Sequence, residues 1–170
     1  MILEINNFLT NDECDYHIKE IKNKQNKISF TNTSSAITDK YQDFDLSTKI
    51  YEKLLKSEEF VRNAKDVIRP NNLIMTSMYN SGTNFGLHTD TGLYYNKITK
   101  EKSKYTVLIY LNDNFEGGQT VFYTDSFQPL KTITPSRGLC IVFDLDQFHE
   151  GLKVISGQKY WIGIELISSF

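Results

Sequence analysis

The stretch QKYWIGIEL, residues 158–166, is the strongest indication of the fold, because its side chains alternate between apolar and polar character. In an extended strand, successive side chains point to opposite faces. One face is wholly apolar and the other carries polar or charged groups: Tyr160, Ile162, Ile164 and Leu166 form the first, and Lys159, Trp161, Gly163 and Glu165 the second. This alternation predicts a strand with a hydrophobic layer on one side and a polar interior on the other.

A second stretch, YTVLIYL (105–111), divides in the same way. Val107, Ile109 and Leu111 form its apolar face, and the opposite face carries Thr106, Leu108 and Tyr110. We expect the apolar faces to pack on helices, and the faces with Thr106, Tyr110 and Lys159 to line the inside of a barrel. A lysine in such a place is costly unless an anion pairs with it. The pattern therefore predicts an acidic ligand, such as a dicarboxylate co-substrate, at Lys159.

The chain changes character at Pro70, which separates a helical part from a strand-rich part. Beyond it, apolar runs bounded by turn residues predict short strands at 73–79, 85–90, 105–111, 119–123, 139–144 and 158–167. This order predicts an α+β fold in which helices support a sandwich or barrel. We expect one domain over 1–170, with a helical support region at 1–70 and the β core at 71–170.

The first 70 residues contain two predicted helices after a short strand at 3–8. The first helix begins at a capping box of Thr10 and Glu13, and its buried side carries Cys14, Ile18 and Ile21. The second spans 46–64, with Ile50, Leu54 and Phe60 with Val61 as its buried side. The Ser-, Thr- and Asn-rich segment 28–42 is expected to be irregular or hairpin-like.

Composition excludes several classes of protein. The net charge of −2 lacks the basic excess of a nucleic-acid-binding protein, and no apolar run approaches membrane-spanning length. The start, MILEINNFL, has no basic segment before a long apolar stretch, so we expect no signal peptide and a cytoplasmic location. Cys14 and Cys140 are too few for a disulfide framework and are expected to be buried thiols.

Two segments carry the chemistry, LHTDTG (87–92) and DQFHEGLKVISGQKYW (146–161). On a strand, His88 and Asp90 project together and Thr89 points away, so that His149 from another strand can complete a face. Two imidazoles and one carboxylate on one face are the ligands of ferrous oxygenases. Of the other candidates, Glu150 is expected to point away from the metal, and His17 to be a solvated residue on a polar helix.

With these motifs, the chain resembles the 2-oxoglutarate- and Fe(II)-dependent dioxygenases, specifically the prolyl 4-hydroxylase-like branch. The resemblance runs from about residue 73 to 166, with a weaker match at 5–18. It is carried by MYNSGTNFGLHTD (78–90), YTVLIYLNDNFEGGQTVFY (105–123) and PSRGLCIVFDLDQFHEGLKVISGQKYWIGIEL (135–166). It implies a double-stranded β-helix, or jelly roll, buttressed by the N-terminal helices.

The resemblance also implies roles for particular residues. His88, Asp90 and His149 match the iron ligands, and Lys159 matches the basic residue that pairs with the distal carboxylate of 2-oxoglutarate; these four form the expected catalytic set. Further co-substrate contacts are implied for Tyr79, Thr106 and Tyr110, and the G-G-x-T turn of Gly117, Gly118 and Thr120 is expected to be structural. The implied cofactors are Fe(II), 2-oxoglutarate and O₂, with ascorbate as reductant and succinate and CO₂ as products.

The substrate is left open between alternatives. Hydroxylation of prolyl residues in a protein or peptide leads, and a free amino acid or other small metabolite is second. A non-catalytic jelly-roll binding module is a third. Loop 91–104 lies at the expected mouth of the site, where Tyr94 and Tyr95 are predicted to contact the substrate and Trp161 to form a wall. Lys104 and Tyr105 stand where many relatives have an arginine, which also leaves the substrate open. Nucleic-acid demethylation is disfavoured, because the sequence shows no basic groove. Halogenation is disfavoured, because Asp90 occupies the position that a halide needs. The oligomeric state is left open.

Overall fold

The computed structural model describes residues 1–25 and 36–169. Its elements follow the chain in this order: β1 (Ile2–Ile5), α1 (Asn11–Gln25), β2 (Ile37–Gln42), α2 (Phe44–Leu54), α3 (Glu58–Asn63), β3 (Val67–Pro70), β4 (Leu73–Asn80), β5 (Phe85–His88), β6 (Lys102–Tyr110), β7 (Glu116–Gly117), β8 (Thr120–Tyr123), β9 (Pro129–Ile133), β10 (Cys140–Asp144), β11 (His149–Gly151), β12 (Val154–Ser156) and β13 (Gln158–Ser168).

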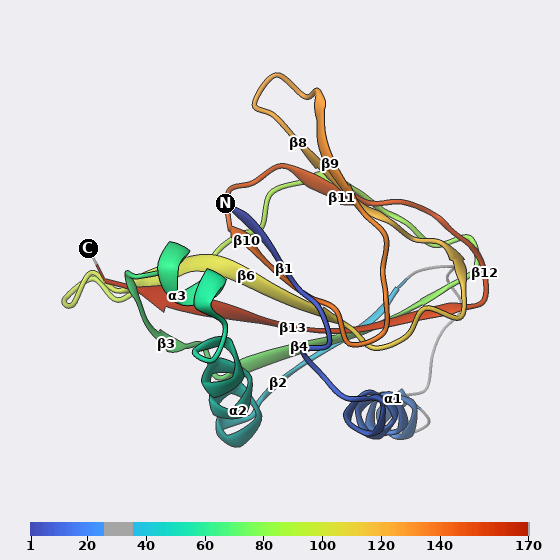
Figure 1. Ribbon diagram of the computed structural model, residues 1–170, viewed down its shortest axis with the longest axis horizontal. Coiled ribbons are helices and arrows are strands. Elements are labelled where there is room, and N and C mark those ends of the chain that lie inside the picture. The colour runs from blue at the N-terminus through green and yellow to red at the C-terminus, as the bar shows by residue number, and fades with distance from the viewer. Residues whose placement is uncertain (26–35, 170) are drawn as a thin grey trace.

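Two main sheets face each other. A seven-stranded sheet has the order β1-β10-β6-β13-β4-β2, with β3 also paired to β13, and a four-stranded sheet has the order β5-β11-β8-β9. The strands β7 and β12 form a small third sheet. Helices α1 and α2 lie on one side of the larger sheet and strands β8, β9 and β11 on the other (Figure 1). The α+β jelly roll with N-terminal helical support, predicted from the sequence, is confirmed.

The alternation along β6 and β13 separates two hydrophobic clusters. Val107, Ile109 and Leu111 pack in one cluster with Ile162 and other residues from the apolar face of β13, and with buried side chains of all three helices. The other face contributes Tyr110, with Leu108 and Trp161 at its edge, to a second cluster with residues of β8, β9 and β10. The prediction that the apolar faces pack on the helices is therefore confirmed.

Helix α1 begins as predicted at a reciprocal capping box. The Glu13 N–H donates to Thr10 Oγ1 (3.2 Å) and the Thr10 N–H donates to Glu13 Oε2 (2.8 Å). Cys14 is fully buried and, like Cys140, is a free thiol, as expected. The prediction for His17 is wrong: it is half-buried, its ring lies 5.2 Å from that of Tyr16, and burial lowers its pKa.

The helix predicted at 46–64 is two helices, α2 and α3. The Ser57 hydroxyl accepts a hydrogen bond from the Phe60 N–H (3.3 Å) and starts a new helix there. A serine placed at an N-cap competes with continuation of the preceding helix. Leu54 and Phe60 are buried as predicted, but Val61 is 46% exposed and does not belong to the buried side.

The six predicted strands are present with shifted ends, and several other strands were not predicted. Strand β5 ends at His88 instead of residue 90, and the first strand ends at Ile5 instead of residue 8. The segment expected to be irregular contains β2 at its end, paired with β4, while 28–35 lie outside the described residues. Within the described ranges, no helix is long and apolar enough to cross a membrane.

Candidate active site

His88, Asp90 and His149 form the one group of potential metal ligands found in the described part of the chain. Their ligand atoms all lie within 4.8 Å of one another. His88, the last residue of β5, pairs directly with His149 of β11. Asp90 is not on the strand, contrary to the predicted alternation, and Thr89 lines the same cavity rather than pointing away. The Asp90 N–H instead donates to the carbonyl of Leu145 (3.0 Å), and this bond places the carboxylate beside the imidazoles.

Backbone carbonyls orient both imidazoles. Nδ1 of His88 lies 2.7 Å from the carbonyl oxygen of Gly86, and Nδ1 of His149 lies 2.9 Å from that of Gln147. A carbonyl can only accept, so Nδ1 carries the proton and Nε2 is left with a free lone pair. Both Nε2 atoms face Asp90 Oδ1, at 3.5 Å from His88 and 3.9 Å from His149.

The carboxylate of Asp90 is held from its other side. Thr106 Oγ1 on β6 donates to Asp90 Oδ2 (2.6 Å), which leaves Oδ1 toward the imidazoles. Burial raises the pKa of Asp90, but the neighbouring His88 side chain and the hydrogen bond from Thr106 lower it more, so the net pKa lies below its ordinary value. Burial lowers the pKa of His88, but Asp90 and the Gly86 carbonyl raise it more. Burial also lowers the pKa of His149. A charged carboxylate beside neutral imidazole nitrogen is a donor set that suits a divalent cation.

Lys159 lies in the same cavity, which has a volume of about 760 Å³. The side chain is 3% exposed, and Nζ donates to the carbonyl of Gly118 (2.6 Å). Nζ also lies 5.8 Å from the ring centroid of Tyr79 and 5.1 Å from that of Tyr110. Burial lowers the pKa of Lys159 to about 8. A buried ammonium with one carbonyl acceptor and two aromatic rings is incompletely compensated, which suits an anionic ligand.

Polar side chains near Lys159 support this interpretation. Tyr79 pairs with Lys159 across β4 and β13 and lines the cavity. Thr120 also lines it and bonds the hydroxyl of Tyr110, which is fully buried behind the wall (2.6 Å). The buried hydroxyl of Thr83, another lining residue, has no hydrogen-bond partner within 1–25 and 36–169. A buried unpaired hydroxyl is costly, and a polar ligand would satisfy it.

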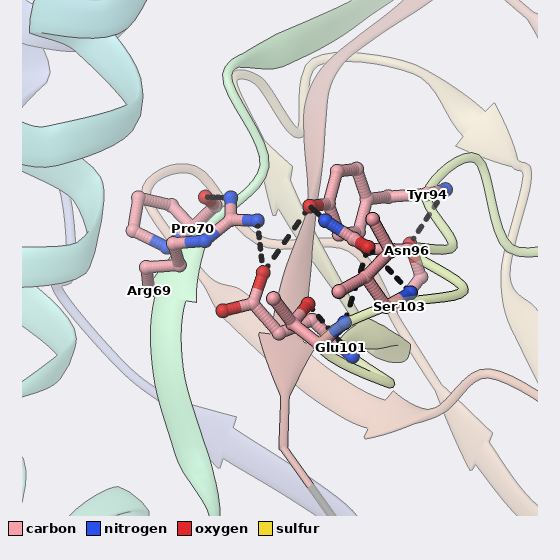
Figure 2. A network of polar contacts seen from close by, with 8 residues as sticks. Arg69, Pro70, Tyr94, Asn96, Glu101 and Ser103 are labelled. Atoms are coloured by element: carbon pink, nitrogen blue, oxygen red, sulfur yellow. Dashed lines mark hydrogen bonds and ion pairs between the residues drawn. The ribbon is translucent and has the colours of Figure 1, made fainter.

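The two tyrosines predicted to contact substrate are not in the cavity wall. Figure 2 shows Tyr94 in a network with Arg69 and Glu101: its hydroxyl donates to Glu101 Oε2 (3.2 Å), and the Arg69 guanidinium lies 4.6 Å from its ring centroid. Tyr95 is 57% exposed and forms a bridge with Lys102. Leu93 lines the cavity in their place, whereas Trp161 does lie in the wall as predicted.

Glu165 is a buried carboxylate of the cavity wall that the sequence interpretation did not assign to the site. It is 2% exposed and lines the cavity from β13. Its place on the same strand face as Lys159 was the available signal. Glu150, in contrast, bonds the hydroxyl of Tyr123 and is absent from the metal-ligand group, as predicted.

The comparisons with known proteins agree with this geometry. A family model described as the 2OG-Fe(II) oxygenase superfamily matches residues 74–164, just over half of the chain. A comparison with curated proteins finds no match. Among solved structures, the viral collagen prolyl hydroxylase of Paramecium bursaria Chlorella virus-1, in complex with 2-oxoglutarate, is 22% identical, with a TM-score of 0.69 over 98% of this chain and 96% of that one.

Two further structures extend the range of chemistry on this fold. A prolyl-4-hydroxylase from Pseudomonas putida is 10% identical, with a TM-score of 0.72 over 99% of this chain and 93% of that one. SnoK, an alpha-ketoglutarate-dependent carbocyclase from nogalamycin biosynthesis, is 13% identical, with a TM-score of 0.69 over 98% of this chain and 79% of that one. At these identities the likeness shows a shared fold and leaves the substrate open.

Proposed function

The chain belongs to the 2OG-Fe(II) oxygenase superfamily, and on that premise we propose that His88, Asp90 and His149 hold its Fe(II) and that Lys159 binds the distal carboxylate of 2-oxoglutarate. Membership makes the protein an oxygenase that uses Fe(II), 2-oxoglutarate and O₂. The observation that carries the residue assignment is that three metal-ligating side chains and one incompletely compensated ammonium share a single cavity. Bound Fe(II) and 2-oxoglutarate supply the activation of O₂, with succinate and CO₂ as products.

The protein's own contribution is orientation, electrostatics and exclusion of water. Thr106 and the two backbone carbonyls hold the three ligands with their free lone pairs facing one another. The rings of Phe122 and Phe143 lie 5.7 and 4.8 Å from that of His149 and keep water from its back face. Lys159 supplies a fixed positive charge, and Tyr79 and Thr83 supply hydroxyl groups for the oxygens of the co-substrate.

For the substrate, we propose prolyl residues of a protein or peptide. The support is that two of the similar structures are a collagen prolyl hydroxylase and a prolyl-4-hydroxylase. Hydroxylation of a free amino acid or other metabolite is the second candidate, favoured by the buried charge of Glu165 in the cavity and by the carbocyclase of the same fold. Ascorbate as reductant, a single domain and a cytoplasmic location remain predictions.

An oxygen-free titration tests the metal and co-substrate assignment. Fe(II) and 2-oxoglutarate should give the weak visible band of a chelate in the wild-type protein, and aerobic turnover should release succinate. His88→Ala should abolish both, because one of three ligands is lost. Aerobic succinate formation that persists in chelator-treated, metal-free protein would contradict the assignment. An intact-mass screen of proline-containing peptides and free amino acids then identifies the substrate by its gain of one oxygen atom.

A further inference from the structure

Glu165 lies beside the metal triad, at the opposite end of the cavity face from Lys159. It pairs across the sheet with Thr106, whose hydroxyl holds Asp90. Lys159 lies six residues earlier on the same face of β13, which places the two Cα atoms about 20 Å apart along an extended strand. A co-substrate that reaches from the triad toward Lys159 therefore leaves the side near Glu165 for the substrate.

The carboxylate of Glu165 is only partly satisfied. Oε2 accepts from the Leu93 N–H (2.9 Å), from the Ser103 hydroxyl and from the Asn71 side-chain amide (3.5 Å). Oε1 accepts only the longer branch of the Leu93 bond (3.2 Å). A carboxylate has about four acceptor positions, so at least one on Oε1 is not used by these donors, and Glu165 lines the cavity.

Within the described ranges, the carboxylate of Glu165 is not in contact with a cation, although the exposed Lys40 also lines the cavity. All the hydrogen-bond donors to Glu165 are neutral, and it forms no ion pair with any of the described residues. With Fe(II) and 2-oxoglutarate in place, the metal and Lys159 offset the charges of Asp90 and of the co-substrate. An unpaired buried carboxylate is unfavourable, so burial raises the pKa of Glu165, and a substrate cation would stabilise its charged form.

We propose that Glu165 binds the protonated amine of the substrate, so that the enzyme oxidises a free amino acid or the amino-terminal residue of a peptide instead of an internal prolyl residue. The nitrogen of an internal prolyl residue is a neutral tertiary amide without a hydrogen, so it offers Glu165 nothing. Proline with a free nitrogen is a secondary ammonium with two N–H donors. This inference rests on the iron and 2-oxoglutarate assignment of the proposed function, and it favours the second substrate candidate, which carries a free amine, over internal prolyl residues.

Paired substrates test the proposal on the wild-type enzyme. Each free amine is compared with its N-acetylated derivative (its twin), by gain of oxygen and by succinate release. The free amines are amino acids, including L-proline, and a peptide with an amino-terminal proline. A charge-assisted hydrogen bond predicts that kcat/KM for the free amine exceeds that of its twin by at least about tenfold. Acetylated compounds that react equally well or better would overturn the proposal and leave the proposed function intact.

The remaining outcomes also decide between the two claims. Failure to form the oxygen-free Fe(II)–2-oxoglutarate complex would count against the proposed function itself. A normal complex that oxidises only peptides with internal proline, or ignores every free amine offered, would overturn only the role of Glu165.

Variants separate recognition by charge from support of the loop that contains Leu93. Glu165→Gln keeps the shape and an acceptor oxygen but removes the charge, so KM for the free amine should rise at least about tenfold and the preference over the twin should vanish. The 2-oxoglutarate affinity and visible band should be unchanged. Ser103→Ala is the matched control. It removes one hydrogen bond to Glu165 but keeps the carboxylate, so it should keep the preference for the free amine. A preference lost equally in both variants, or retained in Glu165→Gln, would assign Glu165 to loop support alone.

Discussion

At the scale of single residues, we expect Lys159 to oppose folding and yet to be needed for binding of 2-oxoglutarate. Its ammonium is buried against the Gly118 carbonyl and two tyrosine rings, without an anion within the described ranges. Replacing a buried charge with an apolar side chain of similar size is often neutral or stabilising. Lys159→Met should therefore unfold at the same urea concentration as the wild type or a higher one, while its affinity for 2-oxoglutarate falls by roughly a hundredfold or more, as for loss of a buried charged contact. A variant that binds 2-oxoglutarate normally would remove Lys159 from the site.

The lowered pKa of Lys159 also predicts how 2-oxoglutarate affinity depends on pH. Burial holds the pKa at about 8 in the protein without ligand. Below that pH the ammonium is already charged, so the dissociation constant should be constant. Above it, binding must take up a proton, and the dissociation constant should rise by up to about tenfold per pH unit. Titrations of the visible band between pH 6.5 and 9.5 measure this slope, and Lys159→Met, which has no proton to take up, should show none of it.

A third prediction concerns Thr106 and the binding of Fe(II). Its hydroxyl donates to Asp90 Oδ2, and valine has the same shape without the donor. Loss of a hydrogen bond that orients a metal ligand typically weakens metal binding by about 10- to 100-fold. Thr106→Val should weaken Fe(II) binding to this extent in an oxygen-free competition titration. Thr132→Val, at an exposed position on β9, is the control and should bind Fe(II) as tightly as the wild type.

At the scale of elements, the turn before β8 sets the position of the Gly118 carbonyl. Gly117 has a φ of +77°, and a Cβ there would lie 2.2 Å from the carbonyl oxygen of Lys153. Gly117→Ala should therefore lower the free energy of unfolding by at least about 1–3 kcal/mol, the cost of backbone strain, before the clash is added. Urea unfolding of Gly86→Ala provides the comparison, because a Cβ at Gly86 meets nothing within 4 Å. Equal stability of the two variants would contradict this view of the turn.

The strands that the sequence predicts are those whose own side chains alternate. Strands β6 and β13 bury one wholly apolar face, and their pattern alone identified both faces correctly. Strand β2, ITDKYQ, alternates only between partly buried and exposed positions, and one of the partly buried residues is Asp39. It has no wholly apolar face, and its pairing with β4 at the sheet edge makes it a strand. Ser57 divides a continuous apolar pattern into two helices. The sequence did not predict this division, because an N-cap depends on one hydrogen bond and does not change the spacing of the apolar residues.

Over the whole molecule, the sequence predicted which residues meet but not how each is held. The spacing of His88, Asp90, His149 and Lys159 was enough to expect one cavity, and they do line one. Asp90 reaches it through a backbone bond to Leu145, a contact with no local signal. The position of Tyr94 was predicted wrongly for a similar reason. The ion pair of Arg69 with Glu101, which has no local signal in the sequence, holds Tyr94 in a network away from the cavity wall (Figure 2).

Ligand-linked stability tests the whole assembly, because the triad joins β5 and β11 of one sheet through Thr106 to β6 of the other. A ligand that binds only the folded state stabilises it by about 2.7 kcal/mol at 100 times its dissociation constant. For a chain of this size that corresponds to a rise of roughly 5–10 °C in Tm. Mn(II), as a redox-inert substitute, should therefore raise Tm at that excess, 2-oxoglutarate should add a second rise, and a chelator should reverse both. Lys159→Met should keep the first rise and lose the second, whereas His88→Ala should lose both. A 2-oxoglutarate rise that survives in Lys159→Met would show that the acid binds elsewhere on the protein.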